Sequence, residues 1–214
     1  MNGGTAVKAN ACLSTQLRWA AASSGAVPAQ PKVQLYVNTA NPGQVISQVS
    51  TWPVAGQNRY GTCDGSNSLA CSYQYGLERA TNTVRNIFVP AARAAGVAAS
   101  ASGYTWWLDV ETGNTWQTGS SAAQARNRAT LEGMTEYLTS AGARVGLYST
   151  SSQWSQVAGS VPTTSTLAPL PSWLAGATSL TGATTNCTKP PLTRGRVVLT
   201  QYVSGGVDRD RSCA

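Results

Sequence analysis

Residues 104–111, YTWWLDVE, constrain the fold more than any other stretch of the chain. They are mostly apolar, β-prone residues without proline or glycine, so they predict a β-strand, which Gly113 and Asn114 end. Asp109 and Glu111 lie two positions apart, and a strand turns such side chains to the same face. Two adjacent carboxylates at a strand end, framed by tryptophans, indicate chemistry on a sugar. The alternative is a strand end whose acids are solvated or paired with arginines.

The order of the predicted elements indicates a parallel α/β fold. Helical spacing and strand patterns alternate along the chain, and the last three strands lack clear helices between them. In parallel α/β domains, active groups gather at the carboxyl ends of the strands. We expect one domain over residues 1–214, with long loops at 44–76 and 177–195 and Trp154 in a loop. The predicted helices cover 12–22, 76–95 and 121–141, and the strands cover 32–38, 104–111, 144–149, 171–176, 196–203 and 205–210.

Composition excludes several kinds of chemistry. The chain has no histidine, which removes Ser-His-Asp and Cys-His catalysis and histidine-ligated zinc. We therefore expect no metal and no cofactor. The 15 basic residues are scattered, so the net charge of +7 does not favour nucleic-acid binding. Only eight acidic residues are present, and four of them fall in Asp109-Val-Glu111 and Asp208-Arg-Asp210. This clustering favours a functional role for the acids.

The five cysteines favour an oxidising compartment. Cys63 and Cys71 bracket a Gly/Asn/Ser loop that a disulfide would close, and a Cys187–Cys213 bridge would fix the end of the chain. Cys12 is left over. We expect a secreted or cell-wall-associated monomer without a membrane-spanning segment. No secretory leader opens the chain at Met1, so we expect the natural protein to begin further upstream.

Five motifs resemble glycoside hydrolase family 25, the lysozyme-type muramidases, and the actinobacterial glycoside hydrolase-like domains related to it. They are WLDVE ending at Glu111, VGLYS at Ser149, SWLA at Ala175, TQY at Tyr202 and GVD at Asp208. The resemblance spans roughly residues 32–214 and implies an irregular TIM-type β/α barrel. It also implies that strand one and most of strand two are absent here, with residues 2–4 matching the end of strand two.

The resemblance assigns roles to the candidate residues. It implies hydrolysis of peptidoglycan or a related N-acetylated glycan, with Glu111 as general acid, its pKa raised by Asp109 and tryptophan walls. Asp109 would stay ionised and stabilise charge on the sugar, and Asp208 would be a further acid. Trp106 and Trp107 are expected in the core. The expected substrate-binding residues are Tyr36, Asn38, Trp116, Tyr148, Trp154, Trp173, Gln201, Tyr202 and Asp210, of which Trp116 and Trp154 would stack on sugar. The alternative function is a catalytically inactive glycan- or cell-wall-binding domain on the same fold.

Overall fold

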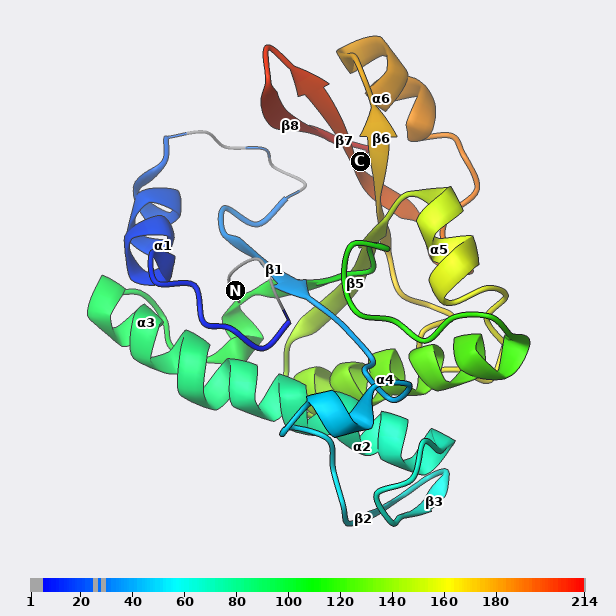
Figure 1. Ribbon diagram of the computed structural model, residues 1–214. Coiled ribbons are helices and arrows are strands. Elements are labelled where there is room, and N and C mark those ends of the chain that lie inside the picture. Colours follow the sequence, from blue (N-terminus) through cyan, green and yellow to red (C-terminus); the bar gives the residue numbers. More distant parts are fainter. Residues whose placement is uncertain (1–5, 25–26, 28–29, 214) are drawn as a thin grey trace.

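The computed structural model describes residues 6–24, 27 and 30–213, and it places a six-stranded sheet at the centre of the molecule (Figure 1). The strand order is β1-β4-β5-β6-β7-β8. Five strands are parallel, and β8 turns back antiparallel to β7. The strands of this sheet are β1 (Gln34–Asn38), β4 (Thr105–Asp109), β5 (Arg144–Ser149), β6 (Ser172–Ala177), β7 (Val197–Ser204) and β8 (Val207–Ser212).

This sheet curls into a half-barrel, and its edges β1 and β8 do not pair with each other. The α/β class and the parallel strands confirm the sequence prediction, whereas a complete TIM-type barrel is not seen. Residues 2–4, expected to match the end of a further strand, lie outside the described residues. The side chain of Gln30 spans the opening, because its Nε2 donates to Val198 O and to Ser212 Oγ, both at 3.2 Å.

Four main helices pack on the sheet through one apolar cluster. Trp106, Leu108 and Val110 project from β4 into that cluster, alternating with residues that face the other way. Ser68 and Ser120 cap α2 and α4 by accepting bonds from Cys71 N and Ala123 N, both at 3.1 Å. The helical elements are α1 (Leu13–Ala22), α2 (Leu69–Asn82), the π-helical segment η2 (Thr83–Phe88), α3 (Val89–Ala95) and α4 (Ser121–Ser140).

Glycines let α2 and α4 touch at backbone distance. A Cβ on Gly76 would lie 1.9 Å from Thr130 O, and one on Gly133 would lie 2.1 Å from Tyr73 O. Both positions therefore require glycine. The prediction of a helix at 121–141 is confirmed, but the preceding helix begins at Leu69 rather than at residue 76.

The predicted loops contain regular structure. Residues 44–76 include η1 (Ile46–Gln48), β2 (Gly56–Asn58) and β3 (Gly61–Cys63), and β2 and β3 form an antiparallel hairpin. Residues 151–157 and 180–186 form α5 (Ser151–Val157) and α6 (Leu180–Asn186), which corrects the expectation of connections without helices. Thr150 and Ser179 cap these short helices. Their sequences are rich in Ser, Thr and Gln, so they show little apolar periodicity.

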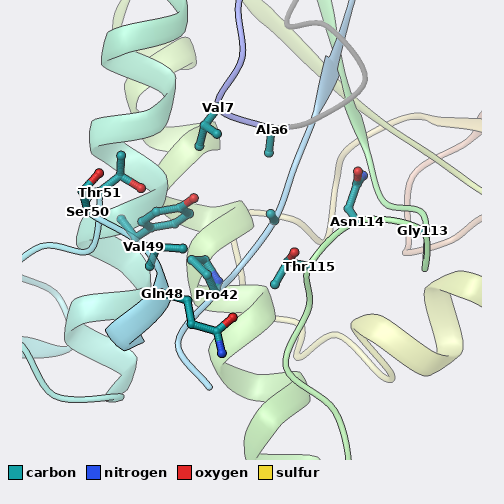
Figure 2. Close-up of a pocket in the computed structure, with 12 residues that line it drawn as sticks. Ala6, Val7, Pro42, Gln48, Val49, Ser50, Thr51, Gly113, Asn114 and Thr115 are labelled. Carbon is teal, nitrogen blue, oxygen red and sulfur yellow. The ribbon is translucent and has the colours of Figure 1, made fainter. Parts of the chain in front are cut away.

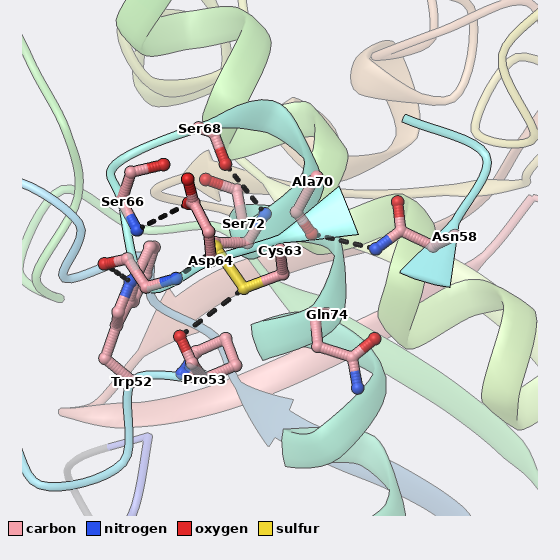
Figure 3. The surroundings of a disulfide bond; sticks show 12 residues. Trp52, Pro53, Asn58, Cys63, Asp64, Ser66, Ser68, Ala70, Ser72 and Gln74 are labelled. Atoms are coloured by element: carbon pink, nitrogen blue, oxygen red, sulfur yellow. Dashed lines mark hydrogen bonds between the residues drawn. A yellow bond between two sulfur atoms is a disulfide. The ribbon is translucent and has the colours of Figure 1, made fainter. Parts of the chain in front are cut away.

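Both predicted disulfides are confirmed, Cys63–Cys71 and Cys187–Cys213, and Cys12 is free and exposed. The first bridge ties the β2–β3 hairpin to the start of α2 (Figure 3). Around it, Trp52 Nε1 donates to Gly65 O at 3.1 Å. Because Cys63 and Cys71 are buried with Trp52, the bridge belongs to a small core of its own.

Replacing Cys63 and Cys71 together by serine is expected to lower the free energy of unfolding by about 2 kcal/mol, because the unfolded chain regains the entropy of a short closed loop. Urea unfolding followed by tryptophan fluorescence measures this change. The matched control is Cys12→Ser, which alters an exposed thiol and should leave stability unchanged. Equal stability of the double variant and the wild type would show that the bridge contributes nothing.

Candidate active site

The acidic pair lies where β4 ends, at the rim of the half-barrel. Asp109 is the last residue of β4 and pairs with Asn38 on β1 and Tyr148 on β5. Val110 N continues the ladder by donating to Tyr148 O at 2.9 Å. Asp109 is only 1% exposed, whereas Glu111 is half-buried. The more accessible carboxylate is therefore Glu111, and Asp109 lies beneath it.

Polar side chains contact both acidic residues. The Tyr36 hydroxyl donates to Glu111 Oε2 at 3.3 Å, and Asn114 Nδ2 donates to Asp109 Oδ2 at 3.4 Å. The Thr39 hydroxyl donates to the backbone oxygen of Asp109. Among the described residues, Asp109 Oδ1 is buried without a hydrogen-bond partner. A buried acceptor without a donor is costly in a structural acid, so Asp109 is a candidate functional residue.

Burial and then the charge of Glu111 raise the pKa of Asp109 to about 7, while hydrogen bonds from Tyr36 and Asn114 act in the opposite direction. A carboxyl with this pKa is half-protonated near neutral pH, so an ionised Asp109 in the reacting form stays a prediction. The pKa of Tyr36 is also raised, first by burial and then by the charges of Asp109 and Glu111. Tyr36 is thus a neutral hydroxyl donor throughout the physiological range.

Aromatic rings line the concave face next to the acids. Tyr36, Tyr148 and Trp173 pack edge to face, with ring centroids 5.0 Å apart for the two tyrosines and 4.8 Å apart for Tyr148 and Trp173. Trp107 continues the wall at 5.6 Å from Trp173. A Cβ on Gly146 would lie 2.2 Å from the Trp107 ring, so this glycine lets the indole lie across β5. Tyr36, Tyr148 and Trp173 are thus brought together as the sequence predicted.

The second acidic motif lies on β8, on the same concave face. Asp210 pairs with Gln201, whose Oε1 accepts from Tyr148 OH at 2.8 Å. Trp173 Nε1 donates to Asp210 Oδ1 at 3.0 Å. The side chain is exposed, but desolvation of the carboxyl and the charge of Asp208 raise its pKa to about 6, against the lowering effect of the Trp173 bond. Asp210 contacts the aromatic wall through Trp173, whereas Asp208, also exposed, lies nearer the rim.

Three predicted site residues lie elsewhere. Trp116 and Trp154 are buried in the main core, 8% and 4% exposed, so neither ring offers an open face for stacking on sugar. Trp154 also belongs to α5 rather than to a loop. Tyr202 alternates with Gln201 along β7 and shares the side of Thr200, which faces α6. Trp106 and Trp107 are buried, which confirms their assignment to the core.

The loop after Glu111 is held by Trp116, which the sequence assigned to sugar stacking, and by residues that sequence reasoning missed. Trp116 Nε1 donates to Glu111 O at 3.1 Å, and Gln153 Oε1 accepts from Thr112 N at 2.6 Å. Gln117 is buried, and its Nε2 donates to Asn41 Oδ1 at 2.9 Å. These contacts hold the loop after Glu111 in place. Such contacts between distant loops leave no periodic signal in the sequence.

A pocket of about 320 Å³ lies beside the acidic pair (Figure 2). Residues 48–51 lie on one side and residues 113–115 on the other, and Asn114 links the pocket to Asp109. The walls combine alkyl groups with amides and hydroxyls and carry no charged side chain. The lining residues are Ala6, Val7, Ala40, Pro42, Gln48, Val49, Ser50, Thr51, Tyr75, Gly113, Asn114 and Thr115.

The described part of the chain carries no sign of two other kinds of site. No cluster of three or more Cys, Asp or Glu side chains able to hold a metal ion is found there. No helix in that part of the chain has the length and apolarity needed to cross a membrane.

Part of the chain matches a known protein family. Residues 92–187, slightly less than half of the chain, are similar to the family described as lysozyme-like protein 1. The match includes β4, β5 and β6, with Asp109, Glu111, Tyr148 and Trp173, and excludes Tyr36 and the β8 acids. No curated protein and no solved structure matches the chain. The matched region supports a lysozyme-like domain and cell-wall glycan hydrolysis in general.

Proposed function

We propose that this protein hydrolyses glycosidic bonds in bacterial peptidoglycan or a related N-acetylated glycan. The observation that carries the proposal is the acidic pair at the end of β4, in which the half-buried Glu111 lies beside the buried Asp109. The similarity of residues 92–187 to a lysozyme-like family supports it independently. The resemblance of five ordered motifs to glycoside hydrolase family 25 supports the finer assignment.

In this proposal Glu111 is the general acid. The reactive form of the pair carries one proton, held on Glu111, while Asp109 is negative. Glu111 protonates the leaving glycosidic oxygen as the substrate's N-acetyl oxygen attacks the sugar carbon. Asp109 stabilises the positive charge that develops on the N-acetyl group. Glu111 then takes a proton from the water that opens this intermediate, so the proton returns to where it began.

The surroundings of the pair suit a neutral sugar. The pocket in Figure 2 offers alkyl groups for an N-acetyl methyl, and amides and hydroxyls for sugar oxygens. Asn114 would contact both the sugar and Asp109. The wall of Tyr36, Tyr148 and Trp173 continues this surface across the concave face. The two disulfides fit an exported protein that meets its glycan outside the cell.

The test is an assay of the purified protein on isolated bacterial walls. The expected result is release of soluble fragments with new reducing ends, identified by mass spectrometry. Walls that have been chemically de-N-acetylated are the matched control, and they should resist cleavage because the N-acetyl group takes part in the reaction. Tight binding to intact walls without release of reducing ends would instead establish the alternative of an inactive glycan-binding domain.

A further inference from the structure

A second cavity, of about 680 Å³, lies between α5, Gln124 on α4 and residues 189–194. It shares no residue with the acidic pair, the aromatic wall or the pocket of Figure 2. Its lining contains Lys189 and Arg194 and no acidic residue. Both cationic side chains are exposed, and within the described part of the chain neither forms an ion pair. The cavity is therefore a positively charged site without an internal counter-ion.

The loop that carries the two cations is held firmly. The Cys187–Cys213 bridge fixes its start, and Pro190 and Pro191 restrict its backbone. Leu192 N donates to Ser172 Oγ at 3.0 Å, and Arg194 N donates to Ala168 O at 2.9 Å. Because Lys189 and Arg194 project from an ordered loop, a ligand has to order only their side chains and not the backbone that carries them.

The opposite wall is uncharged. Trp154 forms part of it with a ring that is only 4% exposed and that belongs to the main core. Ser151 and Ser160 add hydroxyl groups. The proline rings and Val161 offer apolar surface for the carbon side of a polyol.

We propose that this cavity binds a phosphorylated polyol unit of an anionic cell-wall polymer of the poly(glycerol phosphate) type. A phosphate group accepts bonds from a guanidinium and an ammonium group together, which suits Arg194 and Lys189. Its neighbouring hydroxyls match those of Ser151 and Ser160. Binding at this site retains the protein on the wall and does not depend on hydrolysis.

The experiment measures binding of a fluorescently labelled poly(glycerol phosphate) oligomer to the intact protein by anisotropy, at about 0.15 M salt to suppress non-specific attraction. The double variant Lys189→Ala/Arg194→Ala is expected to bind about tenfold more weakly or worse. The charge-matched control is Arg85→Ala/Arg93→Ala, which removes two exposed cations from the α2–α3 side and should change affinity less than about twofold.

Three results would overturn the proposal. One is an equal loss of affinity in the two double variants, which would reflect net charge alone. Another is competition by inorganic phosphate as strong, per phosphate, as that of the oligomer, because the polyol would then contribute nothing. The third is equally tight binding of single-stranded DNA of the same charge. Wild-type hydrolysis of walls is scored separately, so failure of this site and failure of the proposed activity remain distinguishable.

Discussion

Replacement of Glu111 by glutamine is expected to reduce kcat for release of reducing ends by roughly two to four orders of magnitude, the range that positioned general acids contribute. Glutamine preserves the size of the side chain and its ability to accept from the Tyr36 hydroxyl, which lies 3.3 Å from Glu111 Oε2. It cannot deliver a proton to the leaving oxygen. Binding of glycan should therefore change little while turnover is lost.

The matched control for this variant is Glu78→Gln, the same chemical change on α2, where Glu78 Oε1 accepts only from Gln74 in the adjacent turn. It should retain full activity. Thermal unfolding of both variants checks that neither loses the fold. If Glu111→Gln cleaves walls as fast as Glu78→Gln, then Glu111 is not the acid and the role must pass to another carboxyl, with Asp210 the first to test.

The sequence was most informative where a local rule determines structure. Alternation along residues 104–111 predicted a strand that turns Asp109 and Glu111 to one face, and in the structure β4 ends at Asp109 with Glu111 close enough for its charge to raise the pKa of Asp109. Cysteine spacing predicted both disulfides. The predicted helix at 121–141 matches α4, and Gly142 directly after it adopts a positive φ of 78°.

The sequence was least informative where distant segments meet. Trp116 follows a turn signal and was predicted as an exposed sugar platform, but its N–H donates to Glu111 O and its ring is buried. Whether Trp116 stacks on a sugar or supports the loop after Glu111 depends on the packing of α4 and α5, and no local sequence pattern encodes that packing. The raised pKa of Asp109 was not predictable from local sequence either, because it follows from depth of burial more than from the neighbouring Glu111. Spacing alone showed only that the two acids share a face.

Replacement of Asp109 by asparagine is expected to make the protein more stable at alkaline pH. The ordinary pKa of this carboxyl is 3.8 and the folded protein raises it to about 7, so between these values the native state binds more protons than the unfolded state. Native stability therefore falls as pH rises from about 4 to about 7 and stays low above that. Asparagine does not ionise, so the variant avoids this loss, which is on the order of 4 kcal/mol.

Urea unfolding of the wild type, Asp109→Asn and the control Glu78→Gln across about pH 4 to 8 tests this expectation. Any fixed cost of placing an amide near Asn114 shifts the Asp109→Asn curve equally at every pH, so the difference in slope is the diagnostic quantity. Parallel curves for all three proteins would show that Asp109 does not titrate as described. The same variant should lose hydrolytic activity, because the developing charge on the N-acetyl group has no counter-ion. A substitution that stabilises the fold and abolishes turnover is the behaviour expected of an acid retained for chemistry rather than for structure.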